Sequence, residues 1–144
     1  LFGKRVGILE YALYGTREIV DEVGADAPYS EYPWLMWDER LGARMTERWM
    51  KRHAKGARIA CRVDTASAMI AAVRAGIGVQ FILCSAGDAD PNLVRIRDIE
   101  PGFSMGLWLL THPDLRNTAR VRAFMDHMSE ELRPWVDRWA GRAS

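Results

Sequence analysis

The sequence predicts an α/β fold, and three observations support this prediction. Short apolar or alternating segments of strand length recur along the chain, and amphipathic segments of helical length lie between them. Most segments end at Gly, Pro, Asp or Thr, which favour turns and helix caps. Of the 144 residues, 49% are hydrophobic and 27% are charged, the balance of a globular protein with a core. Because strands alternate with helices, we expect a largely parallel sheet.

The first half of the chain contains three expected strands and two expected helices. The strands are Arg5–Tyr11, Trp34–Trp37 and Arg58–Val63, and the helices run from Thr16 to Gly24 and from about Arg40 to His53. The second strand is wholly apolar, which is typical of a strand that is covered on both faces. In the second helix, Leu41, Met45 and Trp49 are spaced as one apolar stripe, so we expect this side to face the core.

The second half continues the alternation. The expected strands are Gly78–Leu83, Leu93–Ile96 and Gly106–Thr111, and the expected helices are Ala66–Ala75 and about Thr118–Leu132. The last helix has one apolar side, formed by Val121, Phe124, Met125, Met128 and Leu132. Three of the six tryptophans, Trp34, Trp49 and Trp108, are expected in the core.

Composition excludes several classes of protein. Lys plus Arg is 20 and Asp plus Glu is 19, and this near-neutral balance argues against nucleic-acid binding through overall charge. No apolar stretch approaches the roughly 20 residues of a membrane span. The two cysteines, Cys61 and Cys84, lie in apolar strand-like segments, so we expect reduced buried thiols and a cytoplasmic location. The first residue is Leu1 and not Met, so we expect a fragment of a longer protein.

Polar residues follow the carboxyl ends of expected strands, where ligands bind in α/β sheets. Asp64, Thr65 and Ser67 open a helix, and its free N–H groups and two hydroxyls suit an anionic group. The same residues also fit an N-cap that serves only its own helix. Trp37 and Asp38 fit either a ligand wall with a polar handle or a buried tryptophan before a helix cap.

Catalytic and metal motifs are not found. His53, His112 and His127 are not in a spacing that zinc sites use. The pair Cys84–Ser85 lacks the flanking glycines of a nucleophile elbow. We therefore expect no enzyme activity, no metal site and no cofactor.

An ordered set of segments resembles the effector-binding domain of LysR-type transcriptional regulators. The segments are VDTASAMIAAVRAGIGVQ (63–80), DADPNLVRI (88–96) and LWLLTHPDLRNTARVRAFMDHM (107–128). They reproduce the family's polar helix start, its A-G-x-G turn into an apolar strand, its P-x-L-V strand, and its H-P-D-x-R then R-V-R-x-F pattern. Trp34–Asp38 and Trp49 fit the family's earlier strand and helix, so the resemblance spans nearly the whole chain.

The resemblance implies a fold similar to periplasmic binding proteins of type 2, with two α/β lobes, an effector cleft between them and two crossing strands. It implies that residues 1–12 form the first hinge strand and residues 13–105 the complete second lobe. Residues 106–144 would form the return strand and a C-terminal helix of the first lobe. The resemblance implies that most of the first lobe and the family's N-terminal helix-turn-helix lie outside this chain.

The resemblance also implies a function: sensing a small molecule to control transcription, without chemistry. It carries the family's effector site onto Trp37, Asp38 and Thr65, with neighbours Asp64 and Ser67. It implies an organic-acid or aromatic effector, assembly as a dimer or tetramer, contact with DNA only through the absent N-terminal domain, and no membrane. Two rivals share the fold: a periplasmic-type solute-binding lobe of a transport system, which needs a leader upstream, and an enzyme, which needs a catalytic group.

Overall fold

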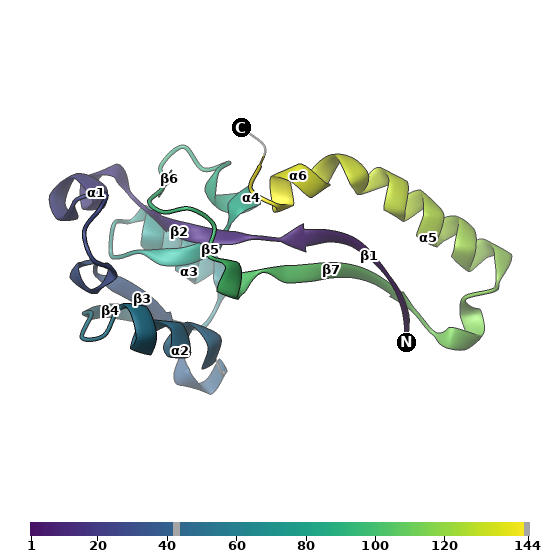
Figure 1. Cartoon of the computed structure of the whole chain (residues 1–144), viewed down its shortest axis with the longest axis horizontal. Coiled ribbons are helices and arrows are strands. Elements are labelled where there is room, and N and C mark those ends of the chain that lie inside the picture. Colours follow the sequence, from purple (N-terminus) through teal and green to yellow (C-terminus); the bar gives the residue numbers. More distant parts are fainter. Residues whose placement is uncertain (42–43, 143–144) are drawn as a thin grey trace.

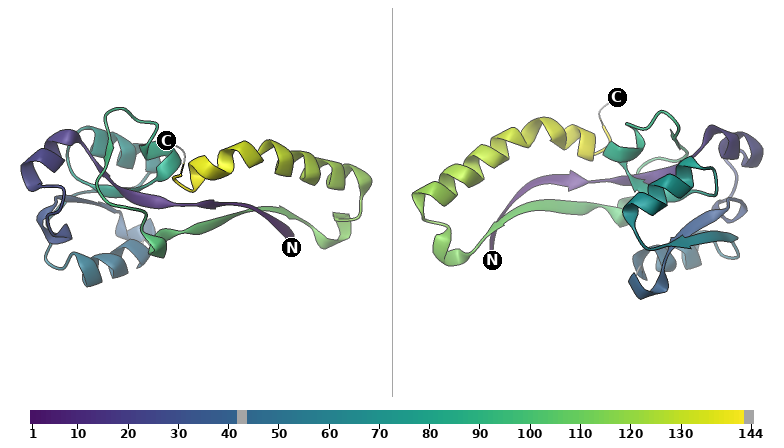
Figure 2. Two further views of the ribbon diagram at one scale, coloured as in Figure 1. Left: turned by 45° about the horizontal axis from the view of Figure 1, so that its top comes forward. Right: turned by 180° about the vertical axis from the view of Figure 1, so that it is seen from behind.

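The computed structural model describes residues 1–41 and 44–142, which form an elongated molecule (Figure 1). A lobe of helices and strands lies at one end, and a two-stranded ribbon with a helix beside it extends from the lobe (Figure 2). The strands are β1 (Phe2–Leu9), β2 (Tyr11–Gly15), β3 (Trp34–Trp37), β4 (Ile59–Val63), β5 (Gln80–Leu83), β6 (Val94–Arg95) and β7 (Met105–Thr111). The α-helices are α1 (Arg17–Val23), α2 (Arg44–His53), α3 (Ala66–Arg74), α4 (Cys84–Gly87), α5 (Ala119–Glu131) and α6 (Val136–Trp139). The 3-10 turns are η1 (Tyr29–Glu31), η2 (Glu39–Leu41), η3 (Pro101–Phe103), η4 (Pro113–Leu115) and η5 (Arg133–Trp135).

The strands of the lobe are not all parallel, which corrects the expectation of a largely parallel sheet. β3 pairs with β4 in parallel, and a parallel bridge between Trp34 and Val79 connects β3 to the start of β5. β2, however, pairs antiparallel with both β5 and β6. A strand that enters the lobe directly from the ribbon needs no crossover helix, so it can lie against the direction of its neighbours.

The expected single strand Arg5–Tyr11 is two strands with a break at Glu10. The backbone N–H of Glu10 donates to the carbonyl of Trp139 at 2.9 Å, and its carbonyl accepts from the N–H of Cys84 at 2.9 Å. The chain therefore changes partners here, from β7 in the ribbon to β5 in the lobe. A sequence of uniform β-propensity carries no signal of such a change.

Two buried clusters form the core of the lobe. The first surrounds Trp34 and Trp49, whose ring centroids are 5.5 Å apart, and the second includes Leu35, Met69 and Val73. The expectation that Trp34 and Trp49 lie in the core is confirmed. The expectation for Trp108 is wrong: it is 52% exposed on β7, which belongs to a two-stranded sheet, and nothing in residues 1–41 or 44–142 buries its ring.

The buried side of α2 differs from the expected stripe. Thr46, Trp49 and Met50 are buried, whereas Met45 is 44% exposed. The buried row is rotated about the helix axis relative to the expected one, because spacing at i and i+4 fits two adjacent rows of a helix equally well. The side chain of Leu41 lies outside the described residues.

The ribbon and α5 together form what we call the arm: β1, β7 and α5. β1 and β7 pair antiparallel from Phe2 opposite Thr111 to Leu9 opposite Met105. The arm is attached to the lobe through the strand break described above and through α6, which packs on β1 and α4. α5 has no buried residue, and on its expected apolar side Phe124 is 58% exposed. The division at residues 12, 105 and 106 stays a prediction.

Candidate functional site

The carboxyl ends of β3 and β4 lie side by side and bring the expected site residues together. Trp37 is opposite Val63 in the parallel register, and the backbone N–H of Asp38 donates to the carbonyl of Val63 at 2.8 Å. Asp38 and Asp64 therefore follow neighbouring strands at one edge of the lobe. Trp37 and Asp38 are half-buried, while Asp64 is exposed.

Thr65 is the N-cap of α3, as expected. Its Oγ1 accepts a hydrogen bond from the N–H of Ala68 at 3.2 Å and lies 3.3 Å from Oγ of Ser67. Both hydroxyl residues are exposed. The cap role leaves them accessible from solvent, so the structure is compatible with both interpretations of this helix start.

Asp38 is held by Arg40. The Nε of Arg40 lies 2.9 Å from Asp38 Oδ1, its Nη2 lies 3.2 Å from Oδ2, and its backbone N–H donates to Oδ1 at 2.9 Å. These hydrogen bonds hold the pKa of the Asp38 carboxyl below its usual range. Asp38 is therefore a carboxylate at neutral pH, with one guanidinium already against it.

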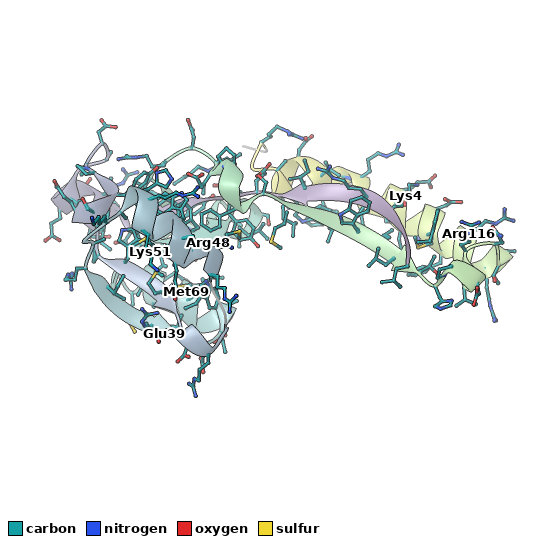
Figure 3. All side chains as sticks on the ribbon, turned by 60° about the horizontal axis from the view of Figure 1, so that its bottom comes forward. Lys4, Glu39, Arg48, Lys51, Met69 and Arg116 are labelled. Carbon is teal, nitrogen blue, oxygen red and sulfur yellow. The ribbon has the colours of Figure 1, made fainter. Side chains whose placement is uncertain are left out.

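A hollow of about 640 Å³ lies beside this edge, between β3, β4 and α2. Its lining is mostly charged: Met36, Glu39, Arg40, Arg44, Glu47, Met50, Lys51 and Arg62. Figure 3 labels Glu39 and Lys51 there. None of the five expected site residues is in its lining; they lie next to it, at the strand ends.

Arg62 connects the strand ends to this hollow, and it was not among the expected residues. Its Nη1 donates to the carbonyl of Trp37 at 3.0 Å, and its Nη2 lies 3.5 Å from Glu39. A charged residue inside an otherwise apolar strand was the available signal. The site therefore contains two guanidinium groups, of Arg40 and Arg62, near the carboxylates.

Comparison with known proteins gives the family. A family model described as the LysR substrate binding domain matches residues 25–133, well over half of the chain. The chain belongs to the LysR substrate-binding domain family. This family is one of transcriptional regulators, so the expected regulator domain is confirmed at the level of the family and the transport alternative is not favoured.

Solved structures share the fold of this LysR substrate-binding domain. The regulatory domain of CrgA, a LysR-type regulator from Neisseria meningitidis, has a TM-score of 0.65 and 13% identity, over 91% of this chain and 68% of that one. ArgP from Mycobacterium tuberculosis has a TM-score of 0.56 and 23% identity, over 89% of this chain and 46% of that one. The effector domain of AmpR of Pseudomonas aeruginosa has a TM-score of 0.60 and 17% sequence identity, over 93% of this chain and 65% of that one. These matches confirm the α/β fold similar to periplasmic binding proteins of type 2.

The chain spans 46 to 68% of the length of these three solved chains. No curated protein matches it. None of the helices in residues 1–41 and 44–142 has both the length and the apolar character needed to cross a membrane.

The LysR substrate-binding domain also contains a polar cluster that joins distant parts of the sequence. The Tyr14 hydroxyl donates to Asp88 Oδ1 at 2.6 Å, and Arg95 pairs with Asp88 and donates to the carbonyl of Gly141 at 3.2 Å. Burial, and then the hydrogen bond to Asp88, raise the pKa of Tyr14. The cluster borders a hollow of about 710 Å³ between α4 and α6. It attaches the C-terminal segment to the lobe.

Neither cysteine is in a disulfide, but only Cys84 is buried as expected, since Cys61 is half-buried. Both Cys61 and Cys84 are free, and Cys84 is fully buried at the start of α4. Burial raises the pKa of the Cys84 thiol, which keeps it protonated at neutral pH. The end of β5 therefore offers no reactive nucleophile at Cys84.

Proposed function

We propose that this domain senses a small-molecule effector at the edge where β3 and β4 end, and so controls a LysR-type transcriptional regulator. The observation that carries the proposal is the pairing of these two strand ends beside the exposed hydroxyls of Thr65 and Ser67. LysR effector-binding domains bind small-molecule effectors, and the regulators act as oligomers. The proposal places the protein in the cytoplasm and assigns no catalysis to it.

Each site residue has a proposed role that follows from its chemistry. Thr65 and Ser67 donate hydroxyl hydrogen bonds to an anionic or polar group at the start of α3. Trp37 supplies an apolar wall for a ring or alkyl part. Asp38 and Asp64 accept hydrogen bonds from hydroxyl or amine groups of the effector.

The guanidinium groups favour an effector that carries a carboxylate. Two carboxylates near the start of α3 would repel an anion if they were alone. Arg40 lies against Asp38, and Arg62 lies at the adjacent carbonyl of Trp37 and 3.5 Å from Glu39, so two guanidinium groups offset two of the three carboxylates at this edge. This balance supports a small organic or aromatic acid as the effector class.

The regulatory step proposed is a change in the orientation of the lobe relative to the arm. Residues 1–12 would be a hinge strand between the lobes, and residues 106–144 would form the return strand and a helix of the other lobe of the full protein. An effector bound between the lobes would favour one orientation over another. Such an effect requires the effector to bind the two states with different affinities. A dimer or tetramer would pass the change to a separate domain that reads the DNA sequence.

Two N-cap threonines provide a matched test. Thr65 caps α3 at the proposed site. Thr16 directly follows β2 and caps α1, where its Oγ1 accepts a hydrogen bond from the N–H of Ile19 at 3.4 Å. A thermal-shift screen of small organic and aromatic acids, on the longest protein that contains this chain, first selects a ligand. Its affinity is then measured calorimetrically for Thr65→Val, Thr65→Ser and Thr16→Val.

The proposal expects Thr65→Val to weaken binding about tenfold, equivalent to one lost hydrogen bond of about 1.4 kcal/mol. Thr65→Ser keeps the hydroxyl and should retain most of the affinity. Thr16→Val should lower stability by about 1 kcal/mol without weakening binding. Equal affinities for Thr65→Val and the unchanged protein would show that Thr65 serves only its helix.

A further inference from the structure

Five basic side chains form a row along α2, which we call the basic row. It consists of Arg44, Arg48, Lys51, Arg52 and Lys55. Arg44, Arg48, Lys51 and Arg52, at i, i+4, i+7 and i+8, fall on one side of α2, Lys55 lies in the turn that follows the helix, and each of the five is exposed. Lys55 follows the last residue of α2 by two positions. Figure 3, in which the lower side of Figure 1 comes forward, labels Arg48 and Lys51 on this helix.

The basic row forms no ion pair within the part of the chain that the structure describes, although Glu39 and Glu47 line the same hollow as Arg44 and Lys51. No carboxylate of residues 1–41 or 44–142 lies within ion-pair distance of any of its five members. The Nε of Arg48 donates instead to the backbone carbonyl of Arg44 at 3.2 Å. Charge is therefore available on this face for an external partner.

Charge is also strongly segregated along the chain. Residues 44–58 contain six Lys or Arg and one Glu, a net charge of +5, whereas the whole chain carries +1. The near-neutral total conceals this patch, so overall charge is a poor guide to whether the domain meets polyanions. A clustered basic face is the feature that phosphate-backbone binding requires.

We propose that the basic row binds the phosphate backbone of double-stranded DNA without reading its sequence. Arg44 and Arg52 are eight residues apart, about 12 Å at the ordinary helical rise. That length faces about three to four phosphates of one DNA strand, at about 3.4 Å of duplex axis per phosphate. Three of the five members are arginines, whose planar guanidinium groups fit phosphate oxygens in pairs.

A second copy of the chain is a weaker partner for the same surface. Residues 17–31 carry five acidic residues and one Arg, a net charge of −4, which is the opposite sign. Only three of these carboxylates lie on α1, so they match part of the basic row. A contact of α1 on one copy with α2 on the next is head-to-tail and builds open chains, not a closed oligomer.

This inference rests on the proposed function, because a transcriptional regulator works beside DNA. It goes beyond that function by giving the sensing domain a DNA contact of its own. The DNA-reading domain would still determine which site is bound, and the basic row would add affinity along the flanking duplex. The contact would also depend on how the lobe is oriented, since α2 is part of the lobe.

The test measures binding of this chain to a labelled duplex of arbitrary sequence by fluorescence anisotropy, between about 20 and 200 mM salt. The test variant is Arg48→Glu with Arg52→Glu. The control is Arg120→Glu with Arg122→Glu, two exposed arginines of α5 whose reversal changes net charge equally. Circular dichroism verifies that both variants fold, and the thermal-shift response to the acid selected in the screen is measured in parallel, with the same substitutions in the longest protein that contains this chain.

We expect binding at low salt, with log K falling linearly as log salt rises. Reversing the charges of Arg48 and Arg52 should lower the affinity for the duplex at least tenfold. It should also reduce the slope of log K against log salt by about 2, since each phosphate contact contributes about 0.9. The control should stay within about twofold, and both variants should keep their effector response. Lost DNA binding with an intact effector response separates this inference from the proposed function.

Three results would overturn the inference. The first is no binding of the unchanged chain even at low salt. The second is an equal loss in both variants, which would indicate net charge alone. The third is concentration-dependent self-association that disappears in the test variant while DNA binding is absent, which would identify a second copy as the partner.

Discussion

Most large apolar side chains of the lobe lie in two buried clusters, with Met45, Ile59 and Ile77 as exposed exceptions, whereas in the arm every one keeps part of its surface exposed. In the lobe, Trp34 and Leu35 on β3 are fully buried, with helices and loops on both sides. In the arm, Trp108, Leu110 and Phe124 are each more than half exposed. The strands of both regions are rich in apolar residues, but only those of the lobe have a second layer to pack against.

The lobe and the arm are therefore stabilised in different ways. The lobe buries enough apolar surface to offset its conformational entropy. The arm depends on the pairing of β1 with β7 and on its attachment at Glu10 and α6. A two-stranded ribbon is marginally stable by itself, so the arm should take its stability from whatever it is attached to. Four predictions test this comparison, from the largest expected effect to the smallest.

Removing one indole from each region should give very different losses. Trp34→Ala empties the centre of a buried cluster and should lower the free energy of unfolding by about 3–5 kcal/mol. Trp108→Ala removes a half-exposed ring from β7 and should cost less than about 1 kcal/mol. Urea unfolding followed by circular dichroism measures both. Similar losses for the two variants would mean that the arm contains a core of its own.

A close backbone contact inside the lobe should resist even one added methyl group. A Cβ on Gly78 would lie 2.6 Å from the carbonyl oxygen of Pro33, which accepts a hydrogen bond from Val79 at 2.8 Å. Gly78→Ala should therefore cost about 1–3 kcal/mol through overpacking. Gly102→Ala, where the nearest atom would be a flexible Glu100 oxygen at 3.4 Å, is the control and should be nearly neutral. Equal stability of the two variants would contradict the prediction.

The polar cluster between lobe and C-terminal segment should make stability depend on alkaline pH. Folding raises the pKa of Tyr14, so its contribution is fully present below the unfolded value of about 10 and is lost as pH rises above it. Tyr14→Phe should cost about 1 kcal/mol at pH 7, from the lost hydrogen bond to Asp88. Above pH 10, the free energy of unfolding of this variant should also fall less steeply with pH than that of the unchanged protein. Urea unfolding across this range measures both, and an unchanged alkaline slope would exclude Tyr14 as the cause.

The smallest effect is expected on α5. Phe124→Ser removes a ring that is 58% exposed, and the free energy of unfolding should change by less than about 0.5 kcal/mol. Binding of a fluorescent apolar dye should fall, because exposed apolar patches attract such dyes. A loss of more than about 1 kcal/mol would show that this ring packs within the molecule in solution.

Much of the fold could be predicted because local patterns determine it. The apolar run at Trp34–Trp37 and the cap at Thr65 locate β3 and α3 from neighbouring residues alone. The exposure of Trp108 could not be predicted in this way, since it depends on which layers surround β7. The same holds for α2, where two adjacent helical rows offer apolar residues and tertiary contacts select one of them.

The candidate site was predictable in position more than in composition. Strand ends and helix starts led to the prediction of Trp37, Asp38 and Thr65, and the register of β3 with β4 places Trp37 opposite Val63, two residues before Thr65; that these residues bind an effector stays a prediction. The roles of Arg40 and Arg62 depend on where long side chains reach across strands, and spacing does not encode that reach. The Tyr14–Asp88 contact joins residues 74 positions apart, so no local pattern contains it.

The break at Glu10 has a mechanical consequence. One residue, Glu10, connects the ribbon to β2; its N–H donates to the carbonyl of Trp139, and its C=O accepts from the N–H of Cys84. The seven residues of β7 extend about 24 Å at the usual rise per residue. A tilt of only about 5° at this joint would therefore move the far tip of the ribbon by about 2 Å, the scale on which neighbouring subunits repack. With such a tilt Glu10 would be the pivot, and a small displacement inside the lobe would become a larger one at the far tip of the ribbon.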